Sequence, residues 1–105
     1  MASNLKNIEF CYFYRDAFGG KVFHSVVFSN QEKFFLKQIR AIIHKKFIQG
    51  KYFYPESVGL PVFFAPMAEL CDHPPYHEYS HVSKTSAPVT SKGFVDIVVF
   101  LEQFL

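Results

Sequence analysis

Two histidines and a glutamate are spaced as in the H-E-x-x-H motif of zinc peptidases, in the segment His77-Glu78-Tyr79-Ser80-His81. In that motif a helix places both imidazoles on one face within reach of a single zinc ion, and the glutamate activates the zinc-bound water. On a strand, residues four apart are separated by about 13 Å, at ~3.3 Å per residue, and cannot share one zinc ion. The local conformation therefore decides whether this segment has the geometry of a zinc site.

The residues around the motif favour a strand. Pro74 and Pro75 directly precede it, so a helix would have to begin within the motif itself. Residues 77–84 alternate in polarity as a strand does. We therefore expect an edge strand on which His77 and Glu78 face solvent.

Two metal-binding alternatives remain open at this point. The first is a metal-dependent hydrolase that uses His77, Glu78 and His81, with His73 as the nearest candidate for a third ligand. The second is a noncatalytic metal site formed by the same histidines together with Cys71, because histidine-rich tracts bind metals. Both require contacts that the sequence alone does not establish.

A second group of candidate residues forms a basic stripe on an expected helix: Lys33, Lys37, Arg40, His44 and Lys45. Such a stripe is able to contact the phosphates of a nucleic-acid backbone. It is also what the solvated side of an ordinary amphipathic helix looks like, and Glu32 beside it favours that interpretation. Nucleic-acid binding through this stripe is thus an alternative rather than the expected function.

The elements that must position these residues follow from patterning. Residues 8–15 and 22–29 alternate as strands, and Gly19-Gly20 between them predicts a tight hairpin turn and antiparallel pairing. Ser29 and Glu32 have the spacing of a capping box, which predicts a helix over residues 31–49 that stops at Gly50.

The second half of the chain is less regular. We expect a connection with one short strand at residues 62–65, a strand over 77–84 and a helix within 94–105, where the β-branched residues leave a buried strand as the alternative. These elements predict an α+β fold, in which an antiparallel sheet of the hairpin plus one or two further strands packs against one long amphipathic helix, with a C-terminal helix beside it. At 105 residues, we expect a single domain over 1–105.

Aromatic residues on the first strand form a third candidate site: Phe10, Tyr12, Phe13 and Tyr14. Such side chains stack on bases in some RNA-binding sheets, but more often they belong to a core. Both faces of this strand carry aromatics, whereas a two-layer domain covers one face of its sheet. The other face is therefore our candidate surface for self-association or a protein partner.

Composition supports a partner surface. Half of the residues are hydrophobic and 19% are aromatic, which is more apolar material than a chain of this size easily buries. The net charge of +2 makes no overall demand for nucleic acid or an anionic membrane, and no apolar run reaches transmembrane length. We expect a cytoplasmic protein with no cofactor and with free thiols at Cys11 and Cys71, for which a single disulfide is the alternative.

Several short motifs, taken in order, resemble a family of small uncharacterised bacterial proteins: YRDA at 14–17, VVFSN at 26–30, GKYFYPESVGLP at 50–61, DHPPYHEY at 72–79, PVT at 88–90 and DIVVFLEQF at 96–104. The resemblance implies that His77-Glu78 belongs to an aromatic-flanked segment in which a second histidine at position 81 is not part of the pattern. It also implies a C-terminal helix, and it brings no established activity. From the residues and the resemblance together, we expect a non-enzymatic accessory or interaction protein that self-associates.

Overall fold

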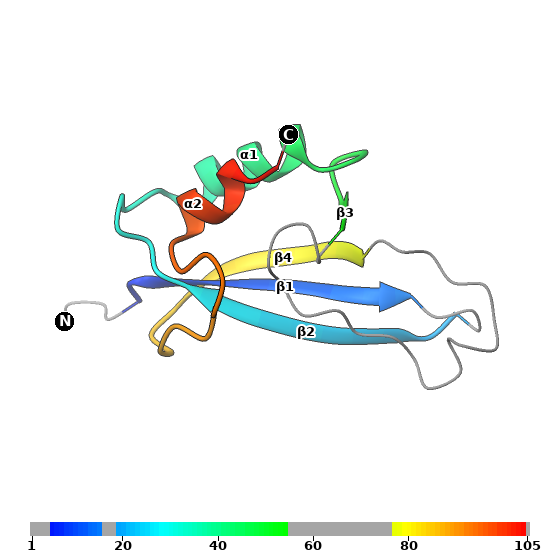
Figure 1. Cartoon of the computed structure of the whole chain (residues 1–105), viewed down its shortest axis with the longest axis horizontal. Helices are drawn as coiled ribbons and strands as arrows, with labels where there is room; N and C mark the ends of the chain where they lie inside the picture. Colours follow the sequence, from blue (N-terminus) through cyan, green and yellow to red (C-terminus); the bar gives the residue numbers. More distant parts are fainter. Residues whose placement is uncertain (1–4, 16–18, 55–76, 105) are drawn as a thin grey trace.

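Four antiparallel strands form one sheet, and two helices pack on one of its faces (Figure 1). The computed structural model describes residues 5–15, 19–54 and 77–104. The elements in chain order are β1 (Asn7–Arg15), β2 (Lys21–Phe28), α1 (Leu36–Lys46), β3 (Tyr52–Phe53), β4 (His77–Thr85) and α2 (Ile97–Glu102). The order of strands across the sheet is β2-β1-β4-β3. The prediction of an α+β fold with an antiparallel sheet is confirmed.

The hairpin of β1 and β2 forms as its alternation predicts. Its register runs from Ile8 opposite Phe28 to Arg15 opposite Lys21, so residues of like parity share a face. Gly19 adopts a φ of +83°, which glycine reaches without the clash that a Cβ would cause. The even-numbered β1 residues from Ile8 onward face the helices, and the odd-numbered ones face away from them.

A β-bulge in β4 changes which face its side chains occupy. Tyr79 lies opposite Tyr12, whereas His81 lies opposite the preceding β1 residue, Cys11, so Ser80 is an extra residue in β4. Before the bulge, His77 and Tyr79 therefore face the helices, and after it Val82 and Lys84 do. We call the opposite face of the sheet, which is turned away from α1 and α2, the distal face.

The first helix is shorter than predicted, because the expected capping box does not form. The hydroxyl of Ser29 donates to Oδ1 of Asp96 at 2.8 Å instead of capping a helix. The backbone N–H of Gln31 donates to the same carboxylate oxygen at 2.9 Å. The helix begins at Leu36 and ends at Lys46, and it has 11 residues rather than spanning 31–49.

A different cap starts this helix. Oε1 of Gln38 accepts a hydrogen bond from the backbone N–H of Phe35 at 2.8 Å, which satisfies a donor that the first turn leaves without a partner. Lys33 adopts a φ of 54°, so the chain turns sharply just before the helix. Residues 30–35 therefore form a loop at the end of the sheet where β2 ends.

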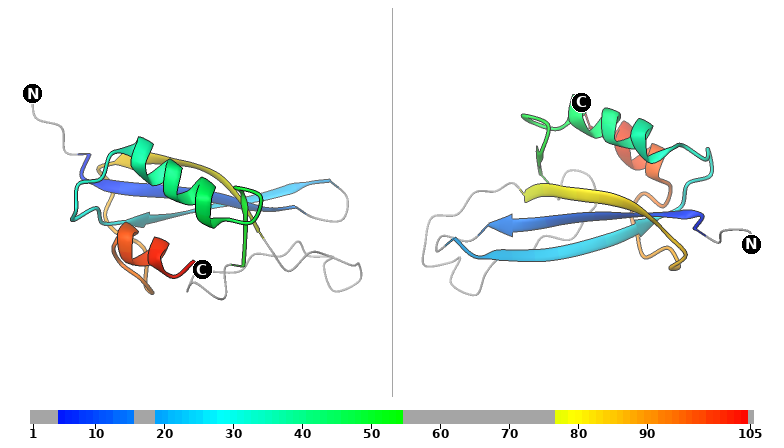
Figure 2. Two further views of the ribbon diagram at one scale, coloured as in Figure 1. Left: turned by 90° about the horizontal axis from the view of Figure 1, so that it is seen from above. Right: turned by 180° about the vertical axis from the view of Figure 1, so that it is seen from behind.

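The two helices lie over one face of the sheet (Figure 2), and the core between the helices and the sheet is largely aromatic. Phe10 stands at its centre, and its ring centroid lies 5.3 Å from that of Phe100, 5.7 Å from Phe53 and 6.1 Å from Phe47. Aromatic rings at such separations contribute about 0.5–1.5 kcal/mol per pair beyond the area that they bury. Much of the high aromatic content is thus used inside the domain.

The remaining predictions have mixed outcomes. The C-terminal helix is confirmed as α2, whose first turn is capped by Oδ2 of Asp96 accepting from Val98 N at 3.1 Å. The two-residue strand β3 lies in a segment that we expected to be a connection. The predicted strand at 62–65 lies outside the described residues. Within the parts of the chain that are described, no helix has the length and apolarity needed to cross a membrane.

Candidate functional site

The H-E-x-x-H segment forms the first part of β4, and its two histidines are not brought together. His77 is 1% exposed on the helix side of the sheet, where its ring packs 5.3 Å from that of Tyr14 and 5.9 Å from that of Tyr12. His81 lies opposite Cys11 on the distal face and is exposed. The extra residue at Ser80 is the reason, because residues four apart on a regular strand would share a face. One metal ion cannot bind both imidazoles in this geometry.

Glu78 is held by an ion pair. Its two carboxylate oxygens accept hydrogen bonds from Nε and Nη2 of Arg15, each at 3.2 Å. The hydrogen bond to Glu78, followed by the charge of its carboxylate, raises the pKa of Arg15 above its ordinary value. The expectation that His77 and Glu78 face solvent is wrong, because only 1% of His77 and 9% of Glu78 are exposed.

Neither metal-binding alternative is assembled by the described residues. Among residues 5–15, 19–54 and 77–104, no group of three histidine, cysteine, aspartate or glutamate side chains is placed to hold a metal ion. The other proposed ligands, Cys71 and His73, lie outside the described residues. The positions of His77 and His81 alone already separate the two ligands that the motif requires.

A cysteine and a histidine meet on the distal face, which sequence spacing did not reveal. Cys11 of β1 lies directly opposite His81 of β4 and Ser25 of β2. Burial, followed by the charge of the Glu9 carboxylate and its hydrogen bond with the thiol, raises the pKa of Cys11 to about 11. Roughly one thiol in ten thousand would be ionised at pH 7, so Cys11 is not an activated nucleophile.

The hairpin end of the distal face carries an aromatic pair. The rings of Phe13 and Phe23 lie 5.1 Å apart, and Phe23 is 61% exposed. Nζ of Lys21 lies 5.0 Å and Cζ of Arg15 lies 5.5 Å from the centre of the Phe13 ring. An exposed aromatic side chain with cations beside it is typical of surfaces that bind a partner.

The predicted aromatic interface divides between the two faces. Phe10, Tyr12 and Tyr14 are fully buried on the helix side, so these three do not form a surface for a partner. Phe13 is on the distal face but is only 7% exposed, because Phe23 and the two cations pack on it. Phe23, on the second strand, is the exposed aromatic residue of this face, and its alternation alone did not identify it.

The basic stripe is divided as well. Lys37, Arg40, His44 and Lys45 are exposed on α1, as expected, but Lys33 lies in the loop before the helix. The neighbouring Lys46 is used inside the domain, where its ammonium group donates to the carbonyl of Leu101 at 3.2 Å. This contact satisfies a carbonyl at the end of α2 and ties the two helices together.

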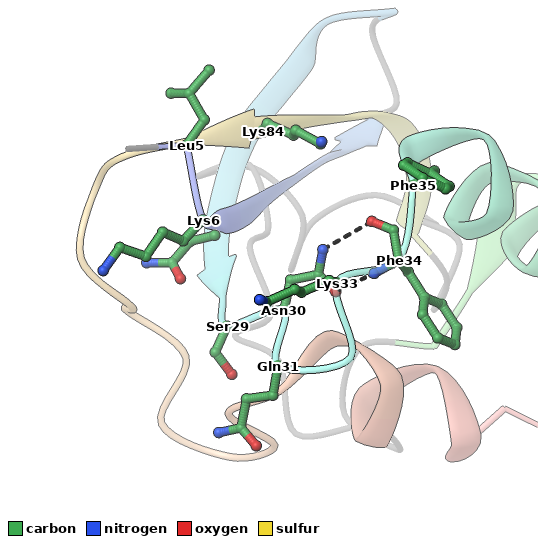
Figure 3. Close-up of a pocket in the computed structure, with 10 residues that line it drawn as sticks. Leu5, Lys6, Ser29, Asn30, Gln31, Lys33, Phe34, Phe35 and Lys84 are labelled. Atoms are coloured by element: carbon green, nitrogen blue, oxygen red, sulfur yellow. Dashed lines mark hydrogen bonds between the residues drawn. The ribbon is translucent and has the colours of Figure 1, made fainter. Parts of the chain in front are cut away.

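Lys33 instead lines a pocket of about 650 Å³ beside the start of α1 (Figure 3). The lining residues come from the beginning of β1, from the loop after β2 and from β4: Leu5, Lys6, Asn7, Ser29, Asn30, Gln31, Lys33, Phe34, Phe35 and Lys84. Lys6 and Lys84 were not identified from the sequence, because they lie far apart along the chain and are brought together by the pairing of β1 with β4.

Comparisons with protein-family models, with curated proteins and with solved structures find no match for this chain. The distal face and the basic pocket are the two surface features with the clearest binding chemistry.

Proposed function

We propose that this chain is a non-enzymatic protein-interaction domain and that its partner is a second copy of itself, docked through the distal face. The observation that carries the proposal is Phe23, which is 61% exposed yet packs on the Phe13 ring. A large aromatic side chain in this position gains burial when a second surface covers it. The end of the hairpin that holds Phe23 extends beyond the two helices, as Figure 1 shows.

The charges of the distal face favour a second copy over an unrelated partner. Arg15 and Lys21 lie opposite each other at the hairpin end, and like charges in that arrangement repel. Glu78 neutralises Arg15, whereas Lys21 forms no ion pair among the described residues. Glu9 lies six positions before Arg15 on the same face of β1. The two residues are therefore about 20 Å apart along the strand, at a rise of ~3.4 Å per residue.

These charges are self-complementary under a two-fold axis. If two distal faces pack with their β1 strands antiparallel, Lys21 of one copy lies over Glu9 of the other, and the reverse contact forms by symmetry. The Phe13 and Phe23 rings and Cys11 then lie between the two charged ends. Sheets packed in this way are separated by about 10 Å, which is the space that such side chains fill.

The absence of catalysis and the cytoplasmic location are part of the same proposal. The raised pKa of Cys11 keeps its thiol protonated at neutral pH, which supports a structural rather than a nucleophilic role. Cys11 is a free thiol, as expected in a reducing compartment.

Sedimentation equilibrium of the purified chain tests the proposal. We expect a dimer whose dissociation constant rises by roughly tenfold or more in Phe23→Ser, which corresponds to about 1.4 kcal/mol. Phe35→Ser is the matched control, because Phe35 is 68% exposed but lies in the loop before α1 rather than on the distal face. A chain that stays monomeric at all concentrations, or a dimer that Phe23→Ser leaves unchanged, would contradict the proposal.

A further inference from the structure

The pocket beside the start of α1 is lined by three lysines. Its three lysines come from three separate segments: Lys6 precedes β1, Lys33 lies in the loop after β2, and Lys84 is near the end of β4. None of the ten lining residues is an aspartate or a glutamate. Three lysines among the lining residues, with no aspartate or glutamate among them, favour the binding of an anion.

Lys84 occupies a position where the pattern of the sheet would place an apolar side chain. The bulge in β4 turns it to the helix side, directly opposite Ile8, which is fully buried. The helix begins only at Leu36, so the loop that precedes it, rather than helix, lies at this end of the sheet. The late start of α1 therefore leaves the cavity that Lys84 lines.

The loop at the pocket is held in one conformation before any ligand arrives. The Asn30 side chain brackets Phe34: Oδ1 accepts from the Phe34 N–H at 3.0 Å, and Nδ2 donates to the Phe34 carbonyl at 2.9 Å, as the dashed lines in Figure 3 mark. Asp96 holds the N–H of Gln31 at 2.9 Å. These contacts stabilise the φ of 54° at Lys33, a conformation that costs a residue other than glycine roughly 1 kcal/mol. A pocket fixed in this way loses little entropy on binding.

The pocket also offers a flat apolar surface. Phe35 lines it and is 68% exposed, and Leu5, another lining residue, is 49% exposed. An exposed phenylalanine ring is a stacking platform for a nucleobase, and such stacking contributes about 1–3 kcal/mol per base. The volume of about 650 Å³ is within the usual range of small-molecule sites.

We propose that this pocket binds a nucleotide, either free or within single-stranded nucleic acid, with its phosphate held by Lys33 and Lys84 and its base stacked on Phe35. The site is distinct from the basic stripe of α1, because it shares only Lys33 with that stripe. It is also separate from the residues that carry the proposed self-association, because Glu9, Phe13, Lys21 and Phe23 do not line the pocket.

Isothermal titration calorimetry with AMP, adenosine, inorganic phosphate and single-stranded pentaadenylate tests this assignment. We expect AMP or pentaadenylate to bind at least roughly tenfold more tightly than adenosine or phosphate alone, because only they engage both the lysines and Phe35. Tighter binding of AMP identifies a free nucleotide as the ligand, and tighter binding of pentaadenylate identifies a nucleic-acid strand.

Variants separate the pocket from general attraction by positive charge. Lys84→Glu, Lys33→Gly and Phe35→Ser should each weaken binding by roughly tenfold. Lys33→Gly removes the ammonium group and suits the positive φ of that position, so the loop is retained. Lys45→Glu, on the exposed side of α1 near its end, is the control with a matched change of charge.

Two results would overturn the assignment. The first is the absence of binding by both AMP and pentaadenylate at about 1 mM ligand, which corresponds to less than ~4 kcal/mol of binding free energy. The second is a loss of affinity in Lys45→Glu as large as that in Lys84→Glu, which would show that charge alone attracts the ligand.

Discussion

Replacing Phe10 by alanine should remove a large part of the stability of the domain. Phe10 is fully buried, and its ring centroid lies 5.3–6.5 Å from those of six other aromatic residues: Tyr12, Phe28, Phe47, Phe53, Tyr79 and Phe100. A buried Phe→Ala substitution costs about 3–5 kcal/mol. Because the substitution removes the ring around which all six of these residues pack, we expect the free energy of unfolding to fall by about 4–5 kcal/mol. The total for a domain is typically about 5–15 kcal/mol.

Urea unfolding followed by far-ultraviolet circular dichroism measures this loss. Phe10→Leu preserves most of the volume and should cost only about 1–2 kcal/mol, so it remains measurable if the alanine variant does not fold. Phe35→Ala is the control, because a side chain that is 68% exposed should change the free energy of unfolding by less than about 0.5 kcal/mol. A loss below about 1 kcal/mol in Phe10→Ala would refute the account of the core.

Three further predictions concern side chains with defined roles. Asp96→Ala should lower the free energy of unfolding by about 2 kcal/mol in urea titrations, because Asp96 caps α2 and accepts hydrogen bonds from Ser29 and Gln31. A change below about 0.5 kcal/mol would contradict that role. Alkylation of native Cys11 by iodoacetamide should have its midpoint near pH 11 rather than near 9.0, the ordinary pKa of a thiol. The stability that depends on the protonated thiol should be complete below pH 9.0 and lost as the pH rises towards 11. A midpoint near 9.0 in the native protein would be inconsistent with the environment of this thiol. His77→Ala should cost about 2 kcal/mol of free energy of unfolding, and His81→Ala less than about 0.5 kcal/mol. Added zinc should not raise the melting temperature of the original chain. A rise with zinc that both substitutions abolish would revive the metal site.

The strands β1, β2 and β4 could be predicted from the sequence, but not the two-residue β3, because the side-chain alternation that signals a strand needs several residues to show. The start of the first helix could not. Ser29 and Glu32 have the spacing of a capping box, but Asp96, which is distant along the chain, takes the Ser29 hydroxyl and the Gln31 N–H. A local motif was thus overridden by a contact between distant segments, and the resulting loop became one side of the basic pocket.

The face that each side chain occupies was only partly predictable. The alternation of β1 correctly separates Phe10, Tyr12 and Tyr14 from Phe13. It does not reveal which face the helices cover. In β4, one extra residue at Ser80 reverses the parity, and no residue type in this segment signals a bulge. For this reason the separation of His77 from His81, the meeting of Cys11 with His81 and the placement of Lys84 in the pocket all required the structure.

Charge reversal on the distal face tests the central proposal most directly. In sedimentation equilibrium, Glu9→Lys and Lys21→Glu should each raise the dissociation constant of the dimer by roughly tenfold or more, because each places like charges opposite each other across the two-fold axis. The double variant Glu9→Lys with Lys21→Glu exchanges the two charges and should restore the dissociation constant to within about threefold of the original value. A double variant that dimerises more weakly than either single variant would contradict docking through the distal face.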